Sequence, residues 1–151
     1  MFVRKLIAYL ICLIPLNVFA AVTVTVQKDI NFGDVLPIGV PATLTVHPDG
    51  SFSDPQGIVL RSNRIQPASF VATSTTTNVD LYISTPTSFT LSNGINTLTV
   101  TNITDSAGGI YQLIGKRKKR ATFSVGGTVN IPGGYISGGD YTGTLIISVD
   151  Y

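Results

Sequence analysis

The sequence predicts an all-β fold, an antiparallel sandwich of the immunoglobulin-like kind, with a jelly roll or a small barrel as the alternative. No window of eleven or more residues carries a 3.6-residue apolar period, whereas short alternating runs are divided by Gly, Pro, Asn and Ser. All eight acidic residues are Asp. Because Asp favours turns and Glu favours helices, the acidic residues also indicate strands and turns.

The first twenty residues have the layout of a secretory signal peptide. Arg4 and Lys5 precede an eleven-residue apolar run, Leu6–Leu16, and Val18-Phe19-Ala20 supplies the small residues of a cleavage site. Eleven residues are too few to cross a bilayer, which needs about twenty. We therefore expect residues 1–20 to be removed, leaving residues 21–151 as one secreted domain without a membrane span. It would pass through the periplasm to the cell surface or the medium.

Removal of this leader changes the composition of the chain. Cys12, the single cysteine, leaves with it, so the mature domain has no disulfide and depends on its hydrophobic core. Loss of Arg4 and Lys5 leaves eight basic against eight acidic residues. The mature domain is therefore neutral, and its overall charge favours no particular partner.

The first expected strand, Ala21–Lys28, has the clearest alternation near the start of the domain. Its apolar face consists of Val22, Val24 and Val26. Asn31-Phe32-Gly33-Asp34 then breaks the strand, and a connection rich in proline follows.

Further strands follow at short intervals, divided by recognisable turns. Pro48-Asp49-Gly50 predicts a tight turn and Asn93-Gly94 predicts a hairpin. A Gly126-Gly127 pair separates the last two runs of this stretch. The runs are Thr43–His47, Gly57–Arg61, Ala68–Thr73, Val79–Ile83, Phe89–Leu91, Leu98–Ile103, Ile110–Ile114, Thr122–Val125 and Thr128–Ile131.

The last eleven residues, Tyr141–Tyr151, predict one long strand that ends the chain. Alternation continues over the whole segment, which at roughly 3.3 Å per residue is about 35 Å long. We expect it to be a terminal pairing strand, held by a neighbouring strand on one or both sides. Its large apolar residues on one face are Tyr141, Leu145, Ile147, Val149 and Tyr151.

Residues able to carry out catalysis are scarce. The single histidine, His47, lies at a turn, and Asp49 belongs to the same turn rather than to a converging triad. No cysteine, glutamate or calcium-loop spacing supplies a metal site in the mature domain. We expect no catalytic residues, no bound metal, no cofactor and no enzymatic activity.

The most unusual local feature is a run of five basic residues: Lys116, Arg117, Lys118, Lys119 and Arg120. One interpretation is a solvated hairpin tip whose charge protects a sheet edge from aggregation. The other is a patch that binds polyanions such as lipopolysaccharide phosphates, glycosaminoglycans or DNA. No aromatic residue lies within the run, so base stacking is not indicated.

Several motifs, in this order, resemble a family of small secreted bacterial all-β domains catalogued as a domain of unknown function. They are Asn31-Phe32-Gly33, His47-Pro48-Asp49-Gly50, Ala68-Ser69-Phe70, Leu98–Asn102, Val125–Val129, Gly139–Gly143 and Val149–Tyr151. The closing strand is also similar to those of spore-coat-U-like domains and chaperone–usher pilins. Those pilins have a glycine about fourteen residues from the end and a terminal aromatic residue, as Gly138 and Tyr151 are here.

The pilin resemblance implies a non-catalytic subunit of a surface fibre, assembled by β-strand donation. Ala21–Lys28 would be the donor strand, and Tyr141–Tyr151 the strand with which a chaperone pairs beforehand. The implied partners are copies of the chain or related subunits, a periplasmic chaperone and an outer-membrane usher. The alternative is a closed, secreted monomer that binds polyanion or glycan through the basic loop.

Overall fold

The computed structural model describes residues 22–53, 57–62, 64–75, 79–113, 120–134 and 138–151. Within these ranges the chain forms thirteen strands and no helix, and every ladder is antiparallel, which confirms the all-β prediction. The strands are β1 (Val22–Lys28), β2 (Asn31–Phe32), β3 (Val35–Pro37), β4 (Ala42–Val46), β5 (Ile58–Leu60), β6 (Ile65–Gln66), β7 (Ala68–Ser74), β8 (Val79–Ser84), β9 (Ser88–Ser92), β10 (Thr97–Asp105), β11 (Ile110–Leu113), β12 (Arg120–Ile131) and β13 (Ser148–Asp150). The predicted leader lies outside the described residues.

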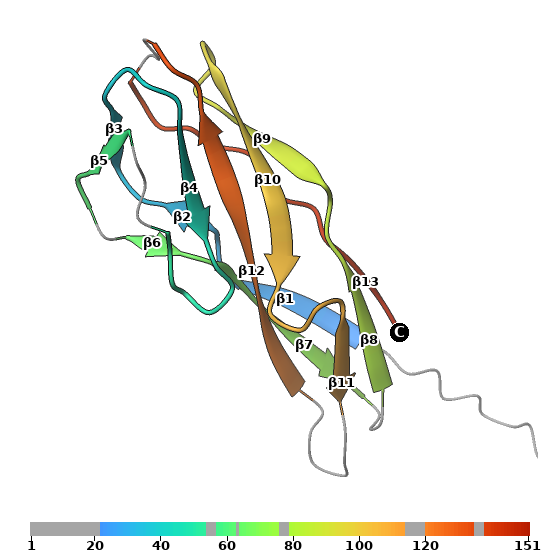
Figure 1. Cartoon of the computed structure of the whole chain (residues 1–151). Coiled ribbons are helices and arrows are strands. Elements are labelled where there is room, and N and C mark those ends of the chain that lie inside the picture. The colour runs from blue at the N-terminus through green and yellow to red at the C-terminus, as the bar shows by residue number, and fades with distance from the viewer. Residues whose placement is uncertain (1–21, 54–56, 63, 76–78, 114–119, 135–137) are drawn as a thin grey trace, which may run out of the picture.

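A six-stranded sheet runs the length of the molecule (Figure 1). Its order is β1-β7-β12-β10-β9, and β4 also pairs with β12. The long strand β12 is central: its first half pairs with β7, its second half pairs with β4, and β10 lies along its other edge.

A smaller sheet of three strands, in the order β11-β8-β13, lies towards the end of the molecule where the chain terminates (Figure 1). Two short ribbons, β2–β6 and β3–β5, lie on the other side. The second layer of the sandwich is therefore much narrower than the first. Part of the large sheet's inner face is left for other segments to cover.

Inward-facing residues of the large sheet and of β8 form the core. Phe70 and Phe123 are cross-strand partners whose rings stack with centroids 5.1 Å apart, and both are almost fully buried. Such aromatic pairs contribute about 0.5–1.5 kcal/mol beyond the burial of their area. Leu44, Val100 and Val125, on three other stretches of the sheet, are completely buried beside them.

Two predicted turns have the expected geometry. The Asn93 amide oxygen accepts hydrogen bonds from the N–H groups of Ile95 (3.0 Å) and Asn96 (2.8 Å), which closes the β9–β10 hairpin. At the other turn, the Gly50 N–H donates to the His47 carbonyl (3.0 Å). A side-chain amide therefore fixes the first reversal, and a backbone hydrogen bond closes the second, where the Asp49 carboxylate also accepts from the Ser51 N–H.

The prediction that Gly126-Gly127 separates two strands is wrong, because β12 continues through the pair. A Cβ on Gly126 would collide with the carbonyl oxygen of Val46, at the end of β4. Here glycine permits another backbone to approach the strand closely.

The segment after β1 also has more regular structure than the sequence predicts. The Asn31–Asp34 stretch was expected to be a simple break, but it begins with β2, and the proline connection contains β3. Both are two- or three-residue pairings with segments about 20 to 35 positions later. Such short, non-local pairings leave little periodicity in the sequence.

Candidate strand-docking groove

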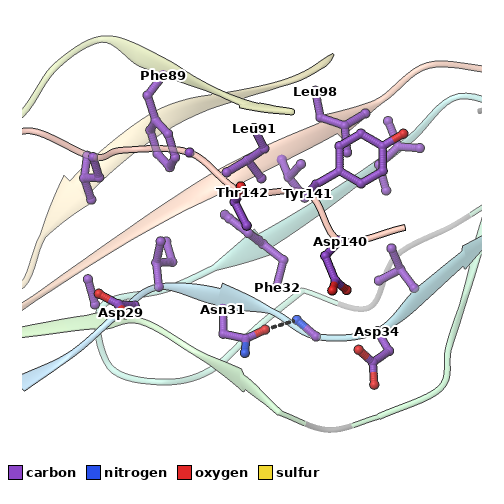
Figure 2. Close-up of a pocket in the computed structure, with 18 of the residues that line it drawn as sticks. Asp29, Asn31, Phe32, Asp34, Phe89, Leu91, Leu98, Asp140, Tyr141 and Thr142 are labelled. Atoms are coloured by element: carbon purple, nitrogen blue, oxygen red, sulfur yellow. Dashed lines mark hydrogen bonds between the residues drawn. The ribbon is translucent and has the colours of Figure 1, made fainter. Parts of the chain in front are cut away.

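A groove of about 1010 Å³ opens between two segments that lie far apart in the sequence (Figure 2). One wall is formed by residues between Val26 and Pro37, and the other by residues between Gly138 and Leu145. The floor is the inner face of the large sheet. It consists of Ala68, Phe70, Phe89, Leu91, Leu98, Val129 and Ile131. This floor is wholly apolar, unlike the rim.

The C-terminal wall is the segment in which the sequence predicts one continuous strand, and that prediction is only partly correct. The alternation holds: Tyr141, Leu145, Ile147 and Val149 pack partly buried against the core, with exposed residues between them. However, only Ser148–Asp150 is a strand. The aromatic Tyr151, expected on the inward face, is 61% exposed.

Two sets of contacts hold this segment and leave the chain between them free of backbone pairing. Thr142 and Ser92 exchange two backbone hydrogen bonds (2.8 and 3.0 Å), and Ser148–Asp150 pairs with β8. From Thr144 to Ile147, no backbone hydrogen bond joins the segment to another described residue. The sheet order also ends at β13, whose second edge has no ladder partner within the described chain. The result is an extended segment with an open edge.

Gly143 explains how this wall lies so close to the large sheet. A Cβ at this position would collide with the carbonyl oxygen of Thr90 and lie 3.1 Å from a methyl group of Leu91. Only glycine permits this close approach to β9. The sequence prediction treats Gly143 as an ordinary position in a strand and misses this role.

The N-terminal wall of the groove is held in place by pairing with β6. Asn31 and Phe32 pair with Gln66 and Ile65 of β6, and the Asn31 side-chain oxygen accepts a hydrogen bond from the Gly33 N–H (2.7 Å; Figure 2). Gly33 has a φ of +74°, a left-handed conformation that disfavours other residues. The Asn-Phe-Gly motif thus turns the chain along the groove.

The predicted first strand is present as β1 and pairs with β7 at the edge of the large sheet. Val22 packs partly buried against the core, but Val24 and Val26 remain 36% and 57% exposed. The β1–β7 register shifts between Val26 and Lys28, so the pairing is irregular where β1 joins the rest of the chain. The strand is therefore in place but its apolar face is poorly covered.

Four charged residues line the groove: Lys28, Asp29, Asp34 and Asp140. All four are exposed. No hydrogen bond or ion pair joins the side chains of Lys28, Asp34 or Asp140 to another described residue. The sequence analysis did not identify these residues, because they are brought together only by the path of two separate segments.

The basic run cannot be located as a patch. Lys116, Arg117, Lys118 and Lys119 lie outside the described residues, and Arg120 is exposed at the start of β12. Elsewhere, His47 is exposed on its turn. Hydrogen bonds from the Ser51 hydroxyl (2.6 Å) and N–H (2.9 Å) hold the pKa of the Asp49 carboxyl below its usual value. Within the described ranges, no three His, Cys, Asp or Glu side chains gather as metal ligands.

The fold and the groove define a small β-sandwich domain with an open sheet edge above an apolar floor. The family model described as "Domain of unknown function (DUF4402)" matches residues 22–151, and the chain belongs to this family. A comparison with curated proteins and one with solved structures found no match. In the described part of the chain, no helix is long and apolar enough to span a membrane.

Proposed function

We propose that the protein is a secreted, non-catalytic subunit of a bacterial surface fibre, in which β1 of one copy occupies the groove of the next. The observation that carries this proposal is the C-terminal segment, whose wall from Gly138 to Leu145 lies beside an apolar floor and whose edge has no backbone partner from Thr144 to Ile147 within the described chain. An extended peptide that adds to such an edge gains main-chain hydrogen bonds and places alternate side chains in the groove.

The strand β1 has the length and the pattern that this groove requires. Its seven residues span about 23 Å, and the wall from Gly138 to Leu145 spans about 26 Å, at roughly 3.3 Å per residue. Its three valines would face the floor, and its threonines would face outward. The irregular pairing near Lys28 provides a place at which β1 can leave β7.

Transfer of β1 from β7 to the groove of the next copy exchanges one set of ladder hydrogen bonds for another. The free energy of transfer therefore depends on how much apolar area of β1 is buried in each position. The exposed fractions of Val24 and Val26 together amount to nearly one whole valine. Complete burial of a valine contributes about 1.5–3 kcal/mol. Each donated strand therefore gains burial of about that size, whereas most of the floor is already buried and only Phe89 and Leu91 have area left to cover.

The proposal includes the partners that the pilin resemblance implies. A chaperone would cover the same open edge before assembly, because a long unpaired edge promotes aggregation. An usher would then join the subunits in order at the outer membrane. The fibre would place the protein on the cell surface.

Peptide binding tests the groove directly. A synthetic peptide of residues 21–29 is added to the protein of residues 21–151, and backbone hydrogen exchange is measured. We expect new protection from Thr144 to Ile146. The control peptide carries Val24→Asp and Val26→Asp and should give none. Protection confined to β7, or no protection, would show that the groove does not accept this strand.

A further inference from the structure

We propose that Asp34 and Asp140 form an acidic end of the groove that receives the Lys28 ammonium of the incoming strand and so fixes its direction. This inference rests on the proposed function, because it concerns the strand that the groove would hold. It identifies a specificity determinant that no motif in the sequence indicates.

The two carboxylates come from opposite walls of the same groove. Figure 2 shows Asp34 on the N-terminal wall and Asp140 on the C-terminal wall towards one end, with Asp29 at the other end. Neither the Asp34 nor the Asp140 carboxylate forms a hydrogen bond or ion pair with another described residue, so both can accept a cation from an incoming strand. An occupant with a cation at this end would be electrostatically complementary.

Lys28 is the matching group on the proposed occupant. It lies two residues after Val26, so in a regularly alternating donated strand it would share the face of the three valines. In the present structure the register shifts between Val26 and Lys28, and Lys28 pairs with Ser69. In the present structure its ammonium has no partner among the described residues. Its long alkyl stem would lie along the apolar floor while the charged end reaches the rim.

Strand geometry then selects the direction of insertion. Residues directly opposite in an antiparallel pair point to the same face, so the valines face the floor only when they lie opposite inward residues such as Tyr141. With Val26 opposite Tyr141, the next inward position of β1 lies opposite Gly139. Lys28 occupies that position, next to Asp140. A parallel strand covering the same stretch would place Lys28 opposite Leu145, roughly 20 Å away.

The charge contribution is tested with labelled peptides of residues 21–29 and fluorescence anisotropy, in EDTA so that no divalent ion occupies the carboxylates. The Lys28→Gln peptide should bind about five-fold more weakly, from two exposed or partly exposed ion pairs. The wild-type peptide should lose a similar factor on the Asp34→Asn, Asp140→Asn protein. Binding of the Lys28→Gln peptide to the Asp34→Asn, Asp140→Asn protein should be no weaker than binding with either change alone. Raised salt should weaken binding only between the wild-type peptide and the wild-type protein.

The direction is tested by disulfide trapping, because the protein of residues 21–151 has no cysteine of its own. Ile146 is 73% exposed and is replaced by cysteine. Antiparallel insertion predicts a cross-link to an Ala21→Cys peptide and not to an Asp29→Cys peptide.

The outcomes separate the two proposals. Equal binding by the charge variants, or a cross-link only to the Asp29→Cys peptide, would overturn the acidic end while leaving strand donation intact, provided that Thr144–Ile146 are still protected. Failure of the wild-type peptide to bind would overturn both.

Discussion

Replacing Val26 with threonine separates the role of β1 in the monomer from its role in the fibre. The two side chains are nearly the same size, and threonine is also favoured in strands, so β1 should still form. In the monomer Val26 is 57% exposed, so it has less than half of the 1.5–3 kcal/mol available from its burial. The hydroxyl can also remain in water. We therefore expect a loss of at most about 1 kcal/mol in the free energy of unfolding.

In the groove the same hydroxyl would lie over a floor with no polar side chain. An unpaired buried hydroxyl costs about 1–3 kcal/mol in proteins, in addition to the lost methyl group. Each strand donation should therefore weaken by about ten-fold or more, since 1.4 kcal/mol corresponds to a factor of ten.

The assay compares urea unfolding of the monomer with the amount of polymer formed by the wild-type and Val26→Thr proteins. Thr25→Ser, on the outward face of β1, serves as the matched control and should leave both quantities nearly unchanged. If Val26→Thr leaves polymer formation intact, or if Thr25→Ser reduces it equally, the valine face of β1 does not enter an apolar groove.

Three further substitutions test the structure around the groove. Gly143→Ala should lower the free energy of unfolding by about 1–3 kcal/mol in a urea titration, since its methyl group would collide with the Thr90 carbonyl; a value near zero would contradict the close approach to β9. Asn93→Ala should lower the free energy of unfolding by about 1–2 kcal/mol, because it removes the hairpin hydrogen bonds and the hydrogen bond from the Asn93 side-chain amide to the Gly138 carbonyl (3.3 Å). Hydrogen exchange should also increase at the start of the C-terminal wall, and unchanged exchange there would refute that link. Because the folded-state pKa of Asp49 is lowered, the stability from its charged carboxylate is present above the unfolded pKa of about 3.9 and is lost as the pH falls through the lower folded value. The difference in urea midpoint between wild type and Asp49→Asn should therefore shrink below about pH 4, and a difference that is independent of pH would contradict the shift.

The sequence predicts the face on which a side chain lies better than it predicts which strands pair. The alternation of Leu145, Ile147 and Val149 correctly indicates which side chains turn inward. In β1 only Val22 packs against the core, and Val24 and Val26 are exposed. Alternation does not depend on a partner, however, so it cannot show that Thr144–Ile147 lack backbone hydrogen bonds. An extended chain beside an open groove and a strand inside a sheet have the same period of two.

The roles of two glycines were also predicted wrongly from the sequence. Gly126 and Gly143 allow close approach of a second backbone, in one case within a strand and in the other beside it. The contact that each permits is made by a segment about 50 to 80 positions earlier in the chain. Asp34 and Asp140 were missed for the same reason, since only the fold brings them to the same groove.

The central claim is that copies of this chain join through β1, and native material tests it most directly. Protein extracted from the cell surface is run on a denaturing gel with and without boiling. Strand-donated polymers have high kinetic stability, so the unboiled sample should show a ladder in steps of one subunit that collapses on boiling. Deletion of Val22–Lys28 should abolish the ladder. A single band under both conditions, from protein that unfolds cooperatively as a monomer, would contradict the claim.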